Sequence, residues 1–169
     1  VKRHPSLVPL SHDHHDALVL AQGLILGSAK SLRSNWPSDR RMQVDRVVEF
    51  FKATLQGHFD LEEAYIFPLV LERIQNQAAL IADLRQDHKR LRRLIEELER
   101  TPSSDLDTKL PALGRLIEVH IRKEERGLFQ AIQNDLNPAE LDKIGKKLAV
   151  HDRVRGDCRL DRVEKRKTV

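Results

Sequence analysis

The chain has 169 residues, of which 40% are hydrophobic, 33% are charged and 4% are aromatic, and its formal net charge is +4. This length and composition are typical of one globular domain, and the abundance of Leu, Ala, Lys, Arg and Glu favours helix. No apolar run approaches the ~18 residues of a membrane span, and a secretory leader is not expected. A single cysteine, Cys158, excludes an internal disulfide and a cysteine-rich metal site. We therefore expect a cytoplasmic protein without a membrane segment.

The first two helices are expected in the N-terminal half of the chain. Ser11 is a candidate N-cap for a helix whose apolar stripe continues to about Arg33. Ser38 ends a turn and is the candidate cap of a second helix that runs to about Glu72. Pro68 lies inside this second helix and is expected to kink it, because its ring removes a backbone hydrogen bond.

Three further helices follow. The pattern predicts a third helix from about Ala78 to Arg100 and a fourth that begins between Asp105 and Leu110 and ends near Asn134, with the start made ambiguous by Pro111. Asn137 followed by Pro138 is a typical helix start, and it opens a shorter fifth helix to about His151. The sequence therefore predicts an all-α fold, an antiparallel up-and-down four-helix bundle with a short additional C-terminal helix.

The basic excess gathers at the C-terminus, which divides the chain into three parts. Between Arg153 and Lys167 there are seven Arg or Lys residues against three acidic ones. Such a tail could contact an acidic partner, but a solvated tail is the favoured interpretation, and nucleic-acid binding is not expected because no aromatic residues or motif accompany the charges. We expect an N-terminal extension over residues 1–10, the bundle with its fifth helix over 11–152, and a basic tail over 153–169.

An internal repeat relates the second helix to the fourth. "HFDLEEAYIF" (His58 to Phe67) and "HIRKEERGLF" (His120 to Phe129) share the pattern His-x-x-x-Glu-Glu-x-x-x-Phe. The first and third helices share a shorter match, in which Asp13-His14 corresponds to Asp87-His88.

The repeated histidines and glutamates lie on the apolar stripes of their helices. Residues four apart share one helical face, so His58 projects with Glu62, and His120 with Glu124. At a rise of ~1.5 Å per residue, antiparallel folding also brings His14 and His88 to about the same level of the bundle. One histidine on such a stripe is usually a satisfied core residue. Two buried carboxylates without partners, however, would cost several kcal/mol each or stay neutral.

Four imidazoles and two carboxylates at one level are a donor set for borderline divalent metals such as Fe, Mn, Zn or Co. Six donors are more than one tetrahedral zinc needs, and glutamates on facing helices can bridge two ions. The sequence therefore predicts a dinuclear site with positions left for water, an oxo or hydroxo bridge, or a diatomic ligand. The candidate ligands are His14, His58, Glu62, His88, His120 and Glu124.

These residues, with "FP" at Phe67-Pro68, resemble the hemerythrin-like (HHE cation-binding) family over roughly residues 10 to 150. The resemblance implies a non-haem di-iron site inside a four-helix bundle, with the same six residues as ligands and the two glutamates bridging; Mn or Zn is the alternative to iron. Oxygen-carrying hemerythrins have a further histidine four residues after the one on the third helix, where this chain has Arg92. The resemblance therefore points away from reversible oxygen transport.

The expected function is a metal-binding protein that binds or senses O2, NO or peroxide, or that handles iron. Two alternatives stay open: a redox enzyme at the same centre, acting on peroxide or ferrous iron, and an interaction module that the metal stabilises. Beside the six residues, His14 is favoured over His15 as the inward histidine, with His12 and His15 as outer or entrance groups. Tyr65 is either a core residue or a neighbour of the metals.

Overall fold

A computed structural model describes residues 3–27 and 36–149, and helices occupy most of them, with no strand in either range. The predicted all-α class is therefore confirmed. The tail at 153–169, together with His151 and Arg33, lies outside the described residues. The labelled elements are η1 (Pro5–Leu7), α1 (Val8–Leu26), α2 (Arg40–Phe50), η2 (Phe51–Leu55), α3 (Gln56–Leu61), η3 (Glu62–Ile66), α4 (Phe67–Arg73), α5 (Ala78–Leu98), α6 (Ser103–Lys123), η4 (Glu124–Leu128) and α7 (Phe129–Asp135).

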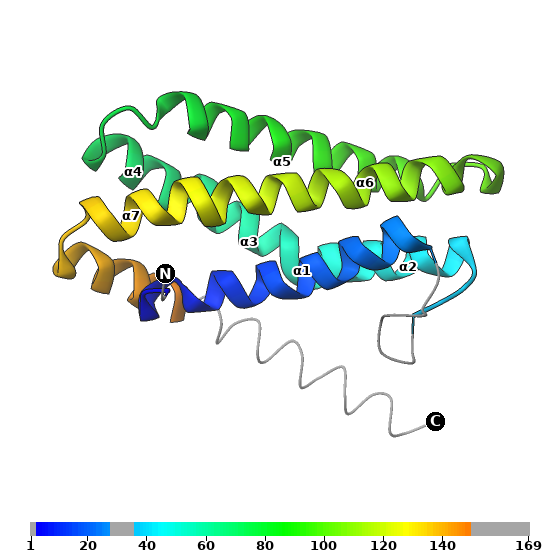
Figure 1. The fold of residues 1–169 in the computed structure, drawn as a ribbon, viewed down its shortest axis with the longest axis horizontal. Coiled ribbons are helices and arrows are strands. Elements are labelled where there is room, and N and C mark those ends of the chain that lie inside the picture. Colours follow the sequence, from blue (N-terminus) through cyan, green and yellow to red (C-terminus); the bar gives the residue numbers. More distant parts are fainter. Residues whose placement is uncertain (1–2, 28–35, 150–169) are drawn as a thin grey trace, which may run out of the picture.

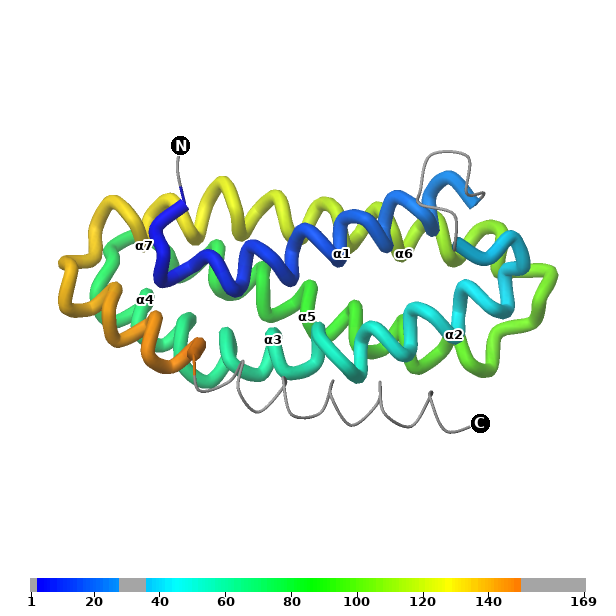
Figure 2. Tube along the Cα trace, turned by 90° about the horizontal axis from the view of Figure 1, so that it is seen from below, coloured from blue at the N-terminus to red at the C-terminus, as the bar shows by residue number. Residues whose placement is uncertain are grey.

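The elements form long helical rods that lie side by side along the longest axis of the molecule (Figure 1). One rod is α1, the next runs continuously from α2 to α4, the third is α5, and the last runs from α6 to α7. The turn between α4 and α5 lies at one end of the molecule, and the turn between α5 and α6 lies at the other. Figure 2 shows the same rods enclosing a common interior. Residues 138–149 form a further helix beside the N-terminal end of α1.

Two apolar clusters fill this interior, one toward each end. The first apolar cluster contains Ala17, Leu20, Ala21, Leu24, Val44, Val47, Phe51, Leu55, Phe59, Leu91, Ile95, Leu98, Leu106, Leu110, Leu113, Ile117 and Ile121. The second apolar cluster contains Leu7, Leu10, Ile66, Phe67, Val70, Ile74, Ile81, Leu84, Leu128, Phe129, Ile132, Leu136, Leu141, Ile144 and Leu148. On every rod the boundary between the clusters falls at the predicted histidines and glutamates. The core is thus apolar at both ends and polar in the middle.

The first helix begins earlier and ends sooner than its sequence pattern predicts. α1 starts at Val8, three residues before the predicted cap Ser11, and Pro9 lies in its first turn, where a missing N–H costs nothing. It ends at Gly27, whose φ of 70° is left-handed, the conformation that favours glycine after a helix.

The second rod is capped by Asp39 rather than by the predicted Ser38, because the Asp39 carboxylate accepts a hydrogen bond from the Met42 N–H (2.9 Å). Two π-helical turns, η2 and η3, interrupt it. Pro68 lies in the first turn of α4, directly after η3. Its missing N–H therefore falls where the π-helical turn already interrupts the regular α-helical hydrogen bonds.

The later helices agree with the predicted order but not with every boundary. α6 begins at Ser103, ahead of the predicted range, and contains Pro111 in its interior. The predicted start of the fifth helix at Asn137 is confirmed by a capping box, in which Asn137 Oδ1 accepts from the Glu140 N–H (3.0 Å) and Glu140 Oε2 accepts from the Asn137 N–H (3.1 Å).

α1 packs closely on α6, because Gly114 has no side chain. A Cβ at Gly114 would lie 2.7 Å from the Ala21 carbonyl oxygen. Within residues 3–27 and 36–149, none of the helices combines the length and apolarity that crossing a membrane requires.

Candidate metal centre

The structure brings the six predicted residues together in the layer between the two apolar clusters. They come from all four rods: His14 from α1, His58 and Glu62 from the α2–α4 rod, His88 from α5, and His120 and Glu124 from the α6–α7 rod. Each is at most 2% exposed. His15 and His12 are exposed, so the structure agrees with His14 as the inward histidine.

The inner atoms form two groups that share a glutamate. In the first group, one donor atom from each of His14, His58, Glu62 and Glu124 lies within 4.8 Å of the others, and in the second the same holds for His88, His120 and Glu124. Glu124 Oε2 lies 3.1 Å from His14 Nε2 and 3.3 Å from His120 Nε2, which places this carboxylate between the groups. Glu62 also faces both, with Oε1 3.4 Å from His58 Nε2 and Oε2 3.5 Å from His88 Nε2.

These inner atoms have few partners within the protein. Both carboxylate oxygens of Glu62 and of Glu124, and Nε2 of His88 and of His120, are buried without a hydrogen bond. Buried polar atoms normally find partners, and an unsatisfied carboxylate is among the most costly groups to bury. The inner atoms are borderline nitrogen and hard oxygen donors, and a divalent cation would satisfy them together. The residues present therefore fit a metal.

Each of the four histidines has a second carboxylate on its outer side. Nδ1 lies opposite a carboxylate oxygen in every case, in the pairs His14–Glu125 (2.7 Å), His58–Asp13 (3.1 Å), His88–Glu63 (2.8 Å) and His120–Asp87 (3.5 Å). At His14, His58 and His88 the outer carboxylate lies within hydrogen-bond distance of Nδ1, whereas Nδ1 of His120 has no hydrogen bond. A carboxylate that accepts the Nδ1–H leaves the Nε2 lone pair directed inward, the arrangement found around metal-binding histidines.

Sequence reasoning missed these outer carboxylates, although the signal was in the repeat. Each is the neighbour of an inner residue, in the doublets Asp13-His14, Glu62-Glu63, Asp87-His88 and Glu124-Glu125. On a helix, adjacent residues point ~100° apart, so the outer carboxylate of each doublet points away from its inner neighbour and reaches the histidine of a neighbouring rod.

The carboxylates raise the pKa values of His14, His58 and His88, and the neighbours of the outer carboxylate Glu125 lower its pKa in turn. Burial alone would lower the pKa of His58, but the charge of Glu62 and the hydrogen bond to Asp13 raise it to about 10. The pKa values of His14 and His88 are raised for the same kind of reason, against burial and through Glu124. Burial alone would raise the pKa of Glu125, but His14, Ser11 and Arg3 lower it to about 2. The layer thus favours positive charge at its centre.

Phenylalanine rings hold two of the histidines in place. His14 stacks on Phe129 (centroids 5.2 Å apart, planes at 14°). His88 stacks on Phe59 (3.9 Å, 16°) and on Phe67 (5.6 Å, 23°). Phe67 and Phe129 are the phenylalanines that end the two repeats, so their role is to fix imidazole planes on neighbouring rods.

The repeat also produces a backbone feature that the sequence pattern did not reveal. The π-helical turns η3 and η4 begin at Glu62 and Glu124, and in each the N–H of the repeat's phenylalanine donates to the carbonyl of that glutamate. Single π-helical turns inside α-helices are frequent at functional sites. Here they occur at the two carboxylates that face both groups of histidines.

A cavity of about 10 Å³ adjoins the inner atoms. It is lined by His14, His58, His120 and Glu124 on one side and by apolar side chains of the first cluster on the other: Leu55, Phe59, Leu91, Ile117 and Ile121. Since a water molecule needs roughly 10–15 Å³, the space is about the size of one water molecule and is too small for an organic substrate.

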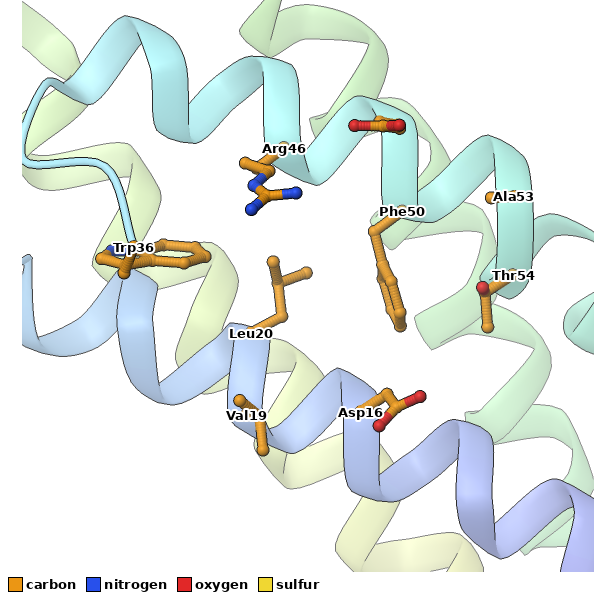
Figure 3. A pocket seen from close by; sticks show the side chains of 9 residues that line it. Asp16, Val19, Leu20, Trp36, Arg46, Phe50, Ala53 and Thr54 are labelled. Atoms are coloured by element: carbon orange, nitrogen blue, oxygen red, sulfur yellow. The ribbon is translucent and has the colours of Figure 1, made fainter. Parts of the chain in front are cut away.

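A larger cavity of about 420 Å³ lies between α1 and α2 and contains none of the six residues (Figure 3). Trp36, Phe50 and Leu20 contribute to its apolar walls, and Asp16, Arg46 and Glu49 carry its charges.

The remaining candidates lie outside the inner layer. Tyr65 packs against the second apolar cluster, with Lys147 Nζ 5.5 Å from its ring centroid, which favours its interpretation as a core residue. The Arg92 guanidinium donates to Glu63 (2.7 Å) and Asp60 (2.9 Å), and so it belongs with the outer carboxylates.

A helical bundle with histidines and glutamates gathered between two apolar clusters defines a cation-binding helical protein. The family model for the Hemerythrin HHE cation binding domain matches residues 7–132, and the chain belongs to this family. The resemblance inferred from the repeat is therefore confirmed. No curated protein and no solved structure matches the chain.

Proposed function

We propose that this protein holds two metal ions, iron in the first instance, and binds or senses a small ligand such as O2, NO or peroxide. The ligands proposed are His14, His58, Glu62, His88, His120 and Glu124, in the antiparallel up-and-down bundle expected of the family. The observation that carries the proposal is the position of Glu62 and Glu124, whose buried oxygens face histidines of both groups and have no hydrogen bond.

Two ions account for this arrangement better than one. The histidines fall into two pairs, His14 with His58 and His88 with His120, and each glutamate faces both pairs. The four histidines together with Glu62 and Glu124 would hold the two ions. Iron and manganese commonly take more ligands than four, so positions remain open for an external ligand.

The surroundings favour a small ligand over an organic substrate. The cavity beside the inner atoms measures about 10 Å³ and its far wall is apolar. An apolar wall offers no hydrogen bonds to a charged or strongly polar molecule, which would have to leave its hydration shell to enter. A neutral diatomic molecule loses little on entering. Bound iron would supply the redox and ligand-binding chemistry, while the outer carboxylates hold the imidazoles with Nε2 directed inward.

Metal analysis combined with absorption spectroscopy tests this proposal. The protein is reconstituted with ferrous iron without oxygen, desalted, and analysed for iron; its spectrum is then recorded before and after addition of NO or O2. We expect about two ions per chain and a new near-ultraviolet or visible band with at least one of the gases. Fewer than about one iron per chain, with no spectral change, would refute the proposal.

The same preparation separates ligand binding from redox turnover. Consumption of peroxide that the wild type catalyses and a Glu62→Ala variant does not would make the centre a redox catalyst. Spectral change on ligand binding without turnover would support a sensor or storage role.

A further inference from the structure

Two arginines, Arg3 and Arg92, contact outer glutamates of the candidate centre. Arg92 Nη1 donates to Glu63 Oε1 (2.7 Å), the same oxygen that lies 2.8 Å from His88 Nδ1. In the same way, Arg3 forms an ion pair with Glu125, whose Oε1 lies 2.7 Å from His14 Nδ1. Arg3 Nη2 also donates to the Glu125 carbonyl (3.1 Å).

Each arginine also covers a phenylalanine ring that supports the same histidine. The Arg92 Cζ lies 5.4 Å from the centroid of Phe59, and Phe59 stacks on His88. The Arg3 Cζ lies 5.1 Å from the centroid of Phe129, and Phe129 stacks on His14. The imidazole is thus fixed at its Nδ1 atom and across its ring face, and one guanidinium contacts both supports.

The chemistry of the guanidinium suits this double contact. It is planar, always charged, and can bond a carboxylate along its edge while its face lies on an aromatic ring, whereas a lysine ammonium is a point charge on a flexible stem. Each arginine has a further anchor: Arg92 Nη2 bonds Asp60 (2.9 Å), and Arg3 Nη1 bonds Gln133 (3.2 Å).

Overall stability does not explain these contacts well. The side chains of Arg92 and Glu63 are 25% and 33% exposed, and those of Arg3 and Glu125 are 18% and 25% exposed. Ion pairs this open to solvent contribute little to folding. The same contacts occur on two unrelated segments, one before η1 and one in α5. This geometry therefore indicates that the arginines serve to hold the histidines in position.

We propose that Arg3 and Arg92 are positioning residues that hold Glu125 and Glu63 in place, so that His14 and His88 keep Nε2 directed at the inner carboxylates. The inference rests on the proposed metal centre and adds two residues that bind no metal themselves. The N-terminal segment becomes part of the centre through Arg3, and position 92 contributes through Glu63 rather than as a ligand.

Metal affinity in a double-mutant cycle tests the proposal at Arg92. Ferrous or cobaltous ion affinity is measured by chelator competition for the wild type, Arg92→Ala, Glu63→Gln and the double variant. Loss of an outer partner of a ligand typically weakens metal binding 10–100-fold, so Glu63→Gln should weaken it by that factor, and Arg92→Ala, which acts through Glu63, by a smaller factor of up to about tenfold. Because the arginine acts through Glu63, the double variant should bind metal about as tightly as Glu63→Gln alone. Arg92→Lys should recover only part of the affinity.

Arg93→Ala is the matched control, because Arg93 is exposed and its nearest acidic partner is Glu97 at 3.6 Å. This control should bind metal like the wild type. Arg3→Ala should reproduce the loss seen with Arg92→Ala. Unchanged affinity in both Arg3→Ala and Arg92→Ala, or full additivity of Arg92→Ala with Glu63→Gln, would overturn the proposal.

A second readout needs no metal. In the metal-free protein, a slowly exchanging Nδ1–H resonance is expected for His88, and Arg92→Ala should broaden or remove it while Arg93→Ala should not. If this resonance responds as expected but no variant binds metal, the proposed function fails and the positioning role stands. An unaffected resonance in Arg92→Ala would contradict the positioning role even if metal binds.

Discussion

Adjacent glutamates 124 and 125 should respond very differently to the same substitution. Glu124 is fully buried, and its Oε2 lies near Nε2 of both His14 and His120. The Glu125 side chain is 25% exposed and contacts Nδ1 of His14. Glu124→Gln removes a carboxylate proposed to touch both ions. Glu125→Gln keeps an acceptor beside His14 and removes only the charge behind it.

The expected magnitudes follow from charge and distance. At 4 Å and an effective dielectric constant of 20, two unit charges attract by about 4 kcal/mol, and a divalent ion roughly doubles this figure. Loss of the Glu124 charge should therefore remove at least one of the two ions. Loss of an outer partner typically costs 10–100-fold in affinity, or about 1.4–2.7 kcal/mol, so Glu125→Gln should keep both ions and bind them more weakly.

The assay is metal content per chain after iron loading and dialysis, joined to chelator competition for the affinity. Circular dichroism establishes that each variant is folded. A Glu124→Gln variant with the metal content and affinity of the wild type would refute the reasoning, and so would equal losses in the two variants.

Three further outcomes can be measured. Ile117→Phe should fill the cavity of about 10 Å³ and weaken the spectral response to NO or O2 while metal content stays unchanged; an unchanged response would show that the ligand approaches elsewhere. Gly114→Ala should destabilise the protein to chemical denaturation by about 1–3 kcal/mol through its contact with the Ala21 carbonyl. Gly127→Ala, which meets only the flexible Leu80 side chain, should change stability by less than about 1 kcal/mol, and the reverse order would contradict the close packing of α1 on α6. In the metal-free protein, protonated His58 contributes stability that is fully present below its unfolded pKa of 6.5 and is lost as pH rises through about 10. The melting temperature without metal should therefore fall across this pH range, more steeply than with metal bound, and a flat profile would argue against the strong coupling of His58 to Glu62.

Local pattern was enough to predict much of the fold. Apolar periodicity along the chain gave the order of the helices, and the Asn137 cap needed only a local rule, because capping depends on neighbouring residues. Boundaries such as Val8 and Ser103 were missed, although each lies beside a proline, with Pro9 in the first turn of α1 and Pro102 directly before α6.

The sequence by itself was enough to select the six residues that lie together in the inner layer. His-x-x-x-Glu places both side chains on one helical face through the fixed geometry of a helix, and its repetition at His58 and His120 marked them as a set. Only the tertiary structure decided which carboxylate lies behind which imidazole, because every such pair joins residues on different rods, as with His88 and Glu63. The contacts of Arg3 with Glu125 and Phe129 depend on residues more than a hundred positions apart, which only the folded chain brings together.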